Sequence, residues 1–213
     1  MKQNCGLLTT SSTPTDIILK MTSCNRNTQL DVDSITRTNQ ILEESSWYHG
    51  SITYKQARQK LKDAKNGTFL VRDSLDPNYL YSVSVKTPRG ATSVRIIYHR
   101  GKFALDCEDA LKPYAPKFEC VIKLLCHYIS ASTGKSKLHK DLKTSNNGQL
   151  VWLEPSGRKD TEAKLMRPLL TNVHSLQHLC RLAINKSCDR WDIMDLDLPL
   201  SLRYYVDRYP YKL

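Results

Sequence analysis

The stretch "TFLVRDS" (68–74) has the composition of a buried β-strand with a charged residue in its interior. Phe69, Leu70 and Val71 are residue types that favour strands and buried positions. Arg72 continues the same run, and its guanidinium stays protonated at every physiological pH. A charge that is buried in a sheet needs a partner of opposite charge or a ligand. Arg72 is therefore the first candidate for a functional residue.

Two explanations of this buried arginine follow from the residues alone. One is an internal ion pair with Asp73, Asp106 or Glu108. The other is an external anion, because more guanidinium and hydroxyl groups fall on the neighbouring strands beside Arg72. The candidate anion site consists of Arg72, Ser74, Ser82 and Arg95. A phosphate has acceptor oxygens that match the guanidinium fork, so a phosphate group is the expected ligand.

The segments around this strand predict an antiparallel sheet with a helix on each face. Thr53 begins a capping-box pattern, and the helix that follows ends near Asn66-Gly67. A second helix is predicted over 116–129, with Pro116 in its first turn. Strands are predicted over 68–74, 79–87, 91–101 and 102–105, with two further short ones at "QLVWLE" (149–154) and "AKLMRPLL" (163–170). This order of elements indicates an α+β fold.

The two ends of the chain differ from this central region. Residues 1–33 are polar and aperiodic and are expected to be disordered, and a short helix is predicted over 34–46. The central domain is expected over 47–170. Residues 171–213 contain one amphipathic helix after Ser175 and another over 200–209. A segment of this length cannot bury two apolar faces by itself. These helices must therefore dock on the central domain or on a partner.

The composition of the 213-residue chain excludes several classes of protein. A net charge of +11 favours anionic partners, but nucleic acid is not expected because no Lys/Arg run with interleaved aromatic residues is present. No apolar stretch approaches the ~20 residues of a membrane span, so membrane insertion is not expected. Seven scattered cysteines favour free thiols in the reducing cytoplasm. Their spacing fits no usual zinc site, and neither a metal nor a cofactor is expected.

Four motifs in the central region resemble the Src-homology-2 (SH2) domain, which binds phosphotyrosine peptides. They are "WYHGSIT" (47–53), "GTFLVRDS" (67–74), "YSVSVKT" (81–87) and "PKFECVIKLLCHYI" (116–129). The resemblance covers roughly residues 47–168. It implies that Arg72 grips the phosphate from the pocket floor, that Ser74 and Ser82 donate hydroxyl groups, and that Arg95 adds a second positive contact.

Two positions depart from the usual SH2 pattern. Many SH2 domains have an arginine early in the first helix, where this chain has Tyr54. The phosphate-loop position after Ser74 is often Ser or Thr, and here it is Leu75. Each departure removes one possible phosphate contact, which bears on affinity more than on function.

The C-terminal helices resemble the suppressor-of-cytokine-signalling (SOCS) box. The relevant stretches are "SLQHLCRLAI" (175–184) and "LDLPLSLRYYVDRYPYKL" (196–213). The resemblance implies that the first helix binds elongin B/C through Leu176, Leu179, Cys180 and Ile184. It also implies that Leu198, Pro199 and Leu202 lie in a segment that recruits cullin-5 with its RING partner. The family's first proline in Leu-Pro-Leu-Pro is replaced by Asp197, which makes the cullin-5 expectation weaker than the elongin one.

An SH2 domain followed by a SOCS box is the architecture of the SOCS family, and the chain resembles the branch of the cytokine-inducible SH2 protein and the second member. The resemblance implies a substrate-recognition subunit of an elongin B/C–cullin-RING ubiquitin ligase. Such a subunit binds a tyrosine-phosphorylated receptor or signalling protein and suppresses cytokine and JAK-STAT signalling. An adaptor that only blocks phosphotyrosine docking sites, without ligase recruitment, is the alternative.

Enzymatic activity is not expected. "HKDLKTSN" (139–146) fits a kinase catalytic-loop pattern, with Asp141 as base and Asn146 as metal ligand. The glycine-rich loop, the V-A-I-K strand and the D-F-G and A-P-E motifs of a kinase are missing from the sequence. A direct kinase inhibitor is not expected either, because residues 27–40 do not resemble the inhibitory segment of some SOCS members.

Overall fold

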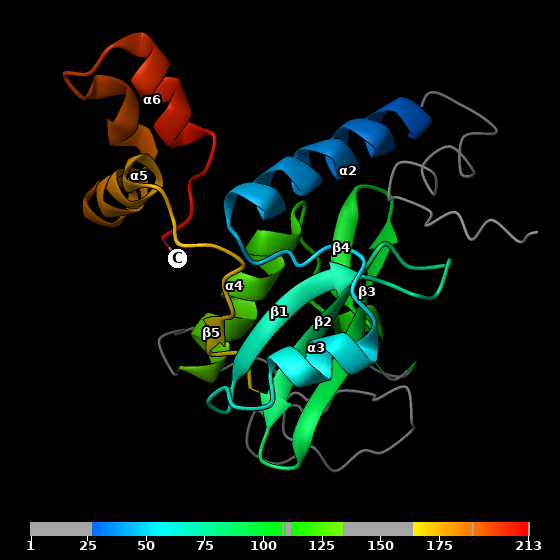
Figure 1. Ribbon diagram of the computed structural model, residues 1–213. Coiled ribbons are helices and arrows are strands. Elements are labelled where there is room, and N and C mark those ends of the chain that lie inside the picture. The colour runs from blue at the N-terminus through cyan, green and yellow to red at the C-terminus, as the bar shows by residue number, and fades with distance from the viewer. Residues whose placement is uncertain (1–26, 108, 110–111, 134–163, 189, 213) are drawn as a thin grey trace, which may run out of the picture.

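The centre of the molecule is a five-stranded sheet in the order β4-β3-β2-β1-β5 (Figure 1). The structure is a computed structural model that describes residues 27–107, 109, 112–133, 164–188 and 190–212. The strands are β1 (Thr68–Asp73), β2 (Tyr81–Thr87), β3 (Gly90–His99), β4 (Lys102–Leu105) and β5 (Arg167–Pro168). β1 to β4 form an antiparallel meander, whereas β5 runs parallel to β1. The predicted α+β fold with an antiparallel sheet is confirmed.

The register of the three central strands separates polar from apolar side chains. Arg72 pairs with Ser82, and Ser82 pairs with Arg95. Directly paired residues project to the same face of a sheet, so these three side chains form one row across β1, β2 and β3. The pairs Val71–Val83 and Val83–Val94 project to the opposite face. One face of the sheet therefore carries the polar row, and the other builds the main core.

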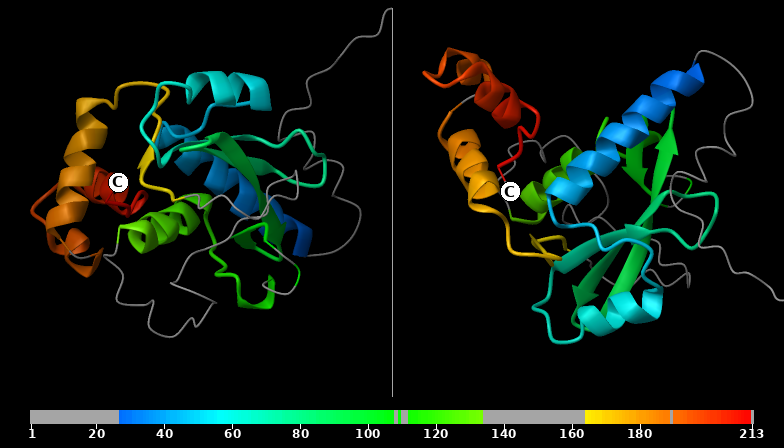
Figure 2. Two further views of the ribbon diagram at one scale, coloured as in Figure 1. Left: turned by 90° about the horizontal axis from the view of Figure 1, so that it is seen from below. Right: turned by 45° about the horizontal axis from the view of Figure 1, so that its top comes forward.

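Two helices cover the two faces of the sheet, as the left view of Figure 2 shows. α3 (Tyr54–Lys60) begins with the predicted capping box, in which Thr53 accepts from the main-chain N–H of Gln56. It lies over the polar face, where Ala57, Leu61 and Leu70 form a small apolar cluster. α4 (Val121–Ser132) covers the other face and buries six of its side chains in the main core.

α2 (Asn27–Glu44) is longer than the helix predicted over 34–46. It packs against α4, with Ile41 and Leu42 in the main core. Residues 27–33 are therefore helical, and the expected disorder of that stretch was wrong. The first turns of α2 have few apolar residues and give no periodic signal. A long-range contact helps to hold them, since the hydroxyl of Tyr98 donates to the carboxylate of Asp31 at 2.7 Å.

Several other element ends differ from the prediction, among them that of α3, which ends at Lys60 and not near Asn66-Gly67. α4 begins at Val121 because Phe118 is extended and exchanges two main-chain hydrogen bonds with Phe103, so Pro116 is not in a helical turn. β3 ends at His99 because Arg100 and the glycine after it have positive φ angles, 48° and 76°. In the described part of "AKLMRPLL", residues 164–170, only Arg167–Pro168 is a strand, and "QLVWLE" lies outside the described residues.

The C-terminal part is helical, as predicted. It comprises α5 (Leu176–Ser187), the 3₁₀ helix η3 (Arg190–Asp195) and α6 (Leu200–Asp207), and a further 3₁₀ helix, η1 (Lys112–Tyr114), precedes α4. The hydroxyl of Ser175 caps α5 by accepting from the main-chain N–H of His178 at 3.2 Å. These helices lie beside the C-terminal end of α2 and one end of α4 (Figure 1). Within the described ranges, no helix is long and apolar enough to cross a bilayer, and no His, Cys, Asp or Glu side chains cluster as metal ligands.

Candidate functional site

A pocket of about 350 Å³ opens between α3 and the polar face of the sheet. All four residues of the predicted anion site contribute to its lining. The lining consists of Arg72, Ser74, Ser82 and Arg95 together with Tyr54, Leu75, Asp76, Thr92, Ser93 and Val94. The structure therefore brings together residues from the start of α3, three strands and the β1–β2 loop.

Arg72 lies at the inner end of this pocket, with only 5% of its surface exposed. Its Nε donates to Ser84 Oγ at 3.2 Å, and its Nη1 donates to the main-chain oxygen of Asp73 at 2.9 Å. Ser84 Oγ is in turn 2.7 Å from Ser93 Oγ, so a chain of hydroxyl groups supports the guanidinium from below. Burial lowers the pKa of Arg72, but an arginine keeps its charge in proteins.

The internal ion pair considered for Arg72 is not formed among the described residues. The carboxylate of Asp73 points to the other face, where it accepts a hydrogen bond from the Tyr48 hydroxyl. Burial raises the pKa of Asp73, and the bond from Tyr48 and the charge of Arg72 oppose that rise. Asp106 lies 4.0 Å from Lys112 instead, and Glu108 is outside the described residues. Arg72 is thus held by neutral oxygen atoms.

Arg95 has a carboxylate partner that the sequence did not indicate. Its Nη2 lies 3.2 Å from Oδ2 of Asp76 in the β1–β2 loop. Its guanidinium also lies over the ring of Tyr79, 4.9 Å from the ring centre. Both members of the ion pair are partly open to solvent, with side-chain exposures of 35% and 28%. The second cation of the pocket is therefore paired, unlike Arg72.

The remaining predicted and divergent positions line the mouth of the pocket. Ser74 Oγ accepts from the main-chain N–H of Asp76 at 3.2 Å, which shapes the loop. Tyr54 stands where many SH2 domains have an arginine, and its hydroxyl donates to the main-chain oxygen of Ala91 at 2.9 Å. Leu75 is exposed at the rim. Tyr54 thus forms a wall of the pocket and ties α3 to β3.

Two serines of the hydroxyl chain that supports Arg72 were missed from the sequence although a signal existed. Ser84 follows Ser82 by two positions in β2, so the strand period places both on the face of Arg72. Ser93 is the direct partner of Ser84 on β3. Asp76 carries no such signal, because it lies in a turn whose path only the folded loop decides.

The C-terminal helix α5 has its apolar face toward solvent. Leu176 is 77% exposed and Leu179 is 46% exposed, Cys180 is exposed, and Ile184 is half-buried. The buried side of the same helix consists of His178, Arg181, Leu182 and Asn185. The possibility that the apolar faces of both C-terminal helices pack on the central domain was therefore wrong for α5, whereas Val206 and Tyr209 of the second predicted face are buried, Tyr209 in the main core. A mainly polar face of α5 docks there instead.

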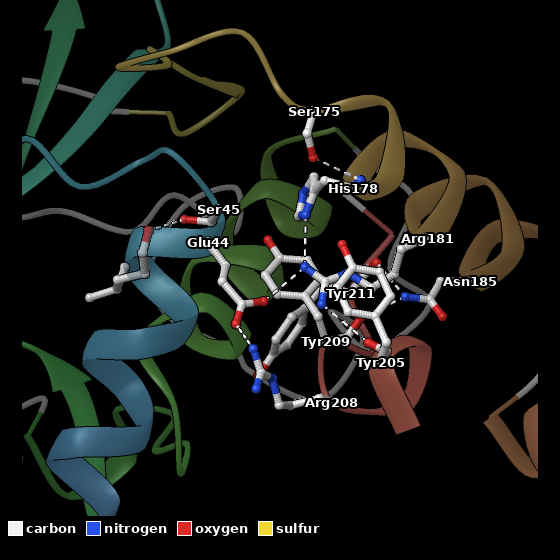
Figure 3. Close-up of polar contacts among 11 residues, drawn as sticks. Glu44, Ser45, Ser175, His178, Arg181, Asn185, Tyr205, Arg208, Tyr209 and Tyr211 are labelled. Atoms are coloured by element: carbon white, nitrogen blue, oxygen red, sulfur yellow. Dashed lines mark hydrogen bonds and ion pairs between the residues drawn. The ribbon is translucent and has the colours of Figure 1, made fainter. Parts of the chain in front are cut away.

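Two charged residues of the C-terminal segment converge on Glu44 at the end of α2 (Figure 3). Arg181 Nη2 is 2.8 Å from one oxygen of Glu44, and Arg208 pairs with the other oxygen. The guanidinium of Arg181 also lies over the ring of Tyr205 at 4.1 Å and over that of Tyr209 at 4.7 Å. We call Glu44, Arg181, Arg208 and these two tyrosines the junction. It fixes α5 and α6 against α2.

Three further hydrogen bonds extend the junction. Arg181 Nη2 donates to Nδ1 of His178 at 2.8 Å. Asn185 Nδ2 donates to the main-chain oxygen of Tyr209 at 2.5 Å and to that of Tyr211 at 3.3 Å. The chain after α6 is thus tied back to α5, and the ring of Tyr209 is buried in the main core.

The segment expected to contact a cullin lies at the start of α6. Pro199 is the N-cap of α6 and is exposed, Leu198 before it is half-buried, and Leu202 in the first turn is exposed. These three residues lie in one short stretch at the start of α6, whereas Leu176 and Leu179 lie on α5. The kinase-like stretch 139–146 lies outside the described residues.

Comparisons with known proteins agree with both parts of the structure. The chain matches the SH2 domain over residues 47–128 and the SOCS box over residues 172–207. It is 40% identical over 190 residues to the cytokine-inducible SH2-containing protein of Gallus gallus, which covers 88% of this chain and 75% of that protein. It is 38% identical over 171 residues to suppressor of cytokine signaling 2 of Homo sapiens, which covers 80% of this chain and 78% of that protein. The chain therefore belongs to the SOCS family, with an SH2 domain and a C-terminal SOCS box.

Proposed function

We propose that the chain binds phosphotyrosine in the pocket between α3 and the sheet. The observation that carries this proposal is the state of Arg72, a buried guanidinium at the inner end of an open pocket whose hydrogen bonds go to neutral oxygen atoms. A buried cation of this kind is stabilised by a doubly charged phosphate, which can accept two parallel N–H bonds. Ser74, Ser82 and Arg95 are the additional phosphate-binding residues of the proposal.

The depth of Arg72 favours phosphotyrosine over phosphoserine. The guanidinium is almost fully buried and lies behind Tyr54 and the β1–β2 loop at the pocket mouth. A phosphate on the short serine side chain cannot reach it without bringing the peptide backbone into the pocket. A phosphate at the end of a tyrosine ring can.

We propose that α5 binds elongin B/C through Leu176, Leu179, Cys180 and Ile184. An exposed apolar helix face of this kind marks a protein interaction site. The opposite face is already occupied by the junction, so the apolar face stays available while the SOCS box is docked. Leu198, Pro199 and Leu202 at the start of α6 are the proposed contacts to cullin-5 and, through it, to its RING partner.

Together these sites support a substrate-recognition subunit of a cytoplasmic ubiquitin ligase. The SH2 domain captures a tyrosine-phosphorylated receptor or signalling protein, and the SOCS box connects it to the ligase. The names of the relatives, cytokine-inducible SH2-containing protein and suppressor of cytokine signaling 2, support suppression of cytokine signalling as the result. The chain itself then does no bond chemistry, and its contribution is to hold target lysines near the conjugating enzyme.

Two measurements test this function. Calorimetric titration of the full chain with a tyrosine-phosphorylated peptide, its unphosphorylated form and a phosphoserine form should give binding only for the first. Co-purification of the chain with elongin B/C should give a stable complex. Equal affinity for all three peptides contradicts phosphotyrosine recognition. Phosphotyrosine binding without elongin capture leaves the adaptor that only blocks docking sites.

A further inference from the structure

The proposed phosphate pocket contains a carboxylate of the chain itself. We propose that Asp76 is a specificity-determining residue that competes with the ligand phosphate for Arg95 and so weakens phosphotyrosine binding. The inference rests on the proposed function of the pocket. The direct observation is the ion pair of 3.2 Å between Asp76 Oδ2 and Arg95 Nη2, two residues that both line the pocket.

Asp76 is oriented toward Arg95 by its own loop. Its Oδ1 accepts from the main-chain N–H of Asn78 at 3.1 Å and from the side-chain amide of Asn78 at 3.0 Å. Its main-chain N–H donates to Ser74 Oγ at 3.2 Å. These bonds occupy one carboxylate oxygen and leave the other directed at Arg95. The carboxylate is thus a fixed part of the pocket wall and not a chance surface contact.

Arg95 is fixed from its other side as well. Its guanidinium lies over the ring of Tyr79, which limits the directions in which it can turn. A phosphate that binds Arg72 and Arg95 together must therefore come close to the carboxylate of Asp76. If Asp76 stays, it repels the dianion, and if it leaves, Arg95 exchanges one anionic partner for another with little net gain.

The competition between Asp76 and the phosphate affects Arg95 and not Arg72. Arg72 is held by Ser84 and a main-chain oxygen, so a phosphate is its first anionic partner. Arg95 already has one. Removing the charge of Asp76 should therefore strengthen binding mainly through Arg95.

The variant Asp76→Asn tests this point with little change to the loop. Asparagine keeps a carbonyl oxygen that can accept from Asn78, while its amide replaces the oxygen that faces Arg95. Because a partly exposed ion pair of this kind is weak, we expect phosphotyrosine peptide to bind about threefold to fivefold more tightly in calorimetric titration. In an Arg95→Gln background, Asp76→Asn should change the affinity by less than about twofold.

Glu119→Gln is the matched control. It also removes one negative charge from an ion-paired surface carboxylate, but Glu119 pairs with Lys102 and Lys123 and does not line the phosphate pocket. We expect Glu119→Gln to bind the phosphotyrosine peptide with the same affinity as the unmodified chain. A gain in affinity for Glu119→Gln as large as that for Asp76→Asn would assign the effect to net charge and overturn the inference.

The remaining outcomes separate this inference from the proposed function. If the unmodified chain binds phosphotyrosine peptide and Asp76→Asn binds no more tightly, the inference is wrong and the function stands. The same holds if Asp76→Asn strengthens binding equally with and without Arg95. If none of the variants nor the unmodified chain binds the peptide, the proposed function fails and this inference fails with it.

Discussion

At the scale of single residues, the pocket depends on a charge that the chain leaves without an anionic partner among its described residues. Arg72 is supported by Ser84 and by a main-chain oxygen, both neutral. Truncating one partner of a buried, hydrogen-bonded charge pair costs about 2–5 kcal/mol. A ligand bound at micromolar affinity has only ~8 kcal/mol of binding free energy in total. A single substitution at Arg72 can therefore remove most of the binding.

We expect Arg72→Lys to bind phosphotyrosine peptide at least about thirtyfold more weakly, because an ammonium group cannot form two parallel bonds to phosphate. Calorimetric titration measures the loss. Arg58→Lys is the control, since Arg58 is exposed on α3 and does not line the pocket. Unchanged affinity of Arg72→Lys would contradict the role assigned to Arg72.

A second residue-scale prediction concerns His178. Its Nδ1 accepts a hydrogen bond from Arg181, which can only donate, so the ring is neutral in the folded chain. Burial, with added repulsion from His174 and Arg181, lowers the pKa of His178 to about 4. The unfolded chain therefore binds more protons between pH 6.5 and 4, and folding stability falls as the pH falls through that range.

The expected loss is about 1–2 kcal/mol between pH 6.5 and 4, and it should be smaller in His178→Asn, whose side-chain oxygen can still accept from Arg181. Denaturant unfolding followed at several pH values measures both chains. His49 in the SH2 domain also has a pKa that burial lowers, and it contributes equally to both chains. An identical pH dependence for the two chains would show that His178 does not titrate as described.

At the scale of elements, α5 has one buried face and one face exposed to solvent. Its mainly polar face is buried against α2 and α6, and its apolar face is open to solvent. The junction compensates the guanidinium Nη atoms of Arg181 and the amide nitrogen of Asn185, while Arg181 Nε and Asn185 Oδ1 are buried without a hydrogen-bond partner among the described residues. The outward position of this apolar face supports the proposed binding of elongin B/C.

We expect the double variant Leu176→Ala with Leu179→Ala to lose elongin B/C capture and to keep its folding stability. Both side chains are exposed, so truncation removes interface contacts without opening a cavity in the core. Quantitative pull-down and thermal unfolding measure the two properties separately. Val173→Ala is the control, because Val173 is 94% exposed but precedes α5. Capture retained by the double variant would exclude this face as the elongin site.

At the scale of the whole molecule, the SH2 domain and the SOCS box are joined through Glu44. This carboxylate receives Arg181 from α5 and Arg208 from the end of α6, and Figure 3 shows how these side chains converge. The side chain of Arg181 is only 1% exposed, and the carboxylate of Glu44 compensates its buried charge. Glu44 therefore contributes to holding the SOCS box on the SH2 domain, together with Leu182 and Tyr209, which are buried in the main core.

We expect Glu44→Gln to weaken the docking of the SOCS box by about 2–3 kcal/mol, because it leaves Arg181 buried without its carboxylate. Hydrogen exchange of the α5 amides should become faster, while exchange in β1 to β3 stays slow. Glu43→Gln removes the adjacent, exposed carboxylate and should leave the exchange of α5 unchanged. Equal protection of α5 in both variants would show that Glu44 does not hold the junction.

Several elements could be predicted from local pattern alone. The capping box at Thr53, the alternating strands and the amphipathic α5 all have a short-range signal that survives in the fold. Where such a signal was weak, the prediction was wrong. The first turns of α2 depend on Tyr98, and the extended segment before α4 depends on main-chain pairing between Phe103 and Phe118. These contacts join residues far apart in the chain.

The sequence by itself indicated the two modules, through the resemblance of their motifs, and the sheet that carries Arg72. Strand periodicity also placed Arg72, Ser82 and Arg95 together, because residues of one face recur every second position. Only the tertiary structure decided how their charges are matched. Asp76 pairs with Arg95 because folding brings the β1–β2 loop next to β3. Glu44 pairs with Arg181 because folding brings the end of α2 next to α5. An ion pair between distant residues leaves no periodic trace in a sequence, since any of several carboxylates would satisfy the same arginine.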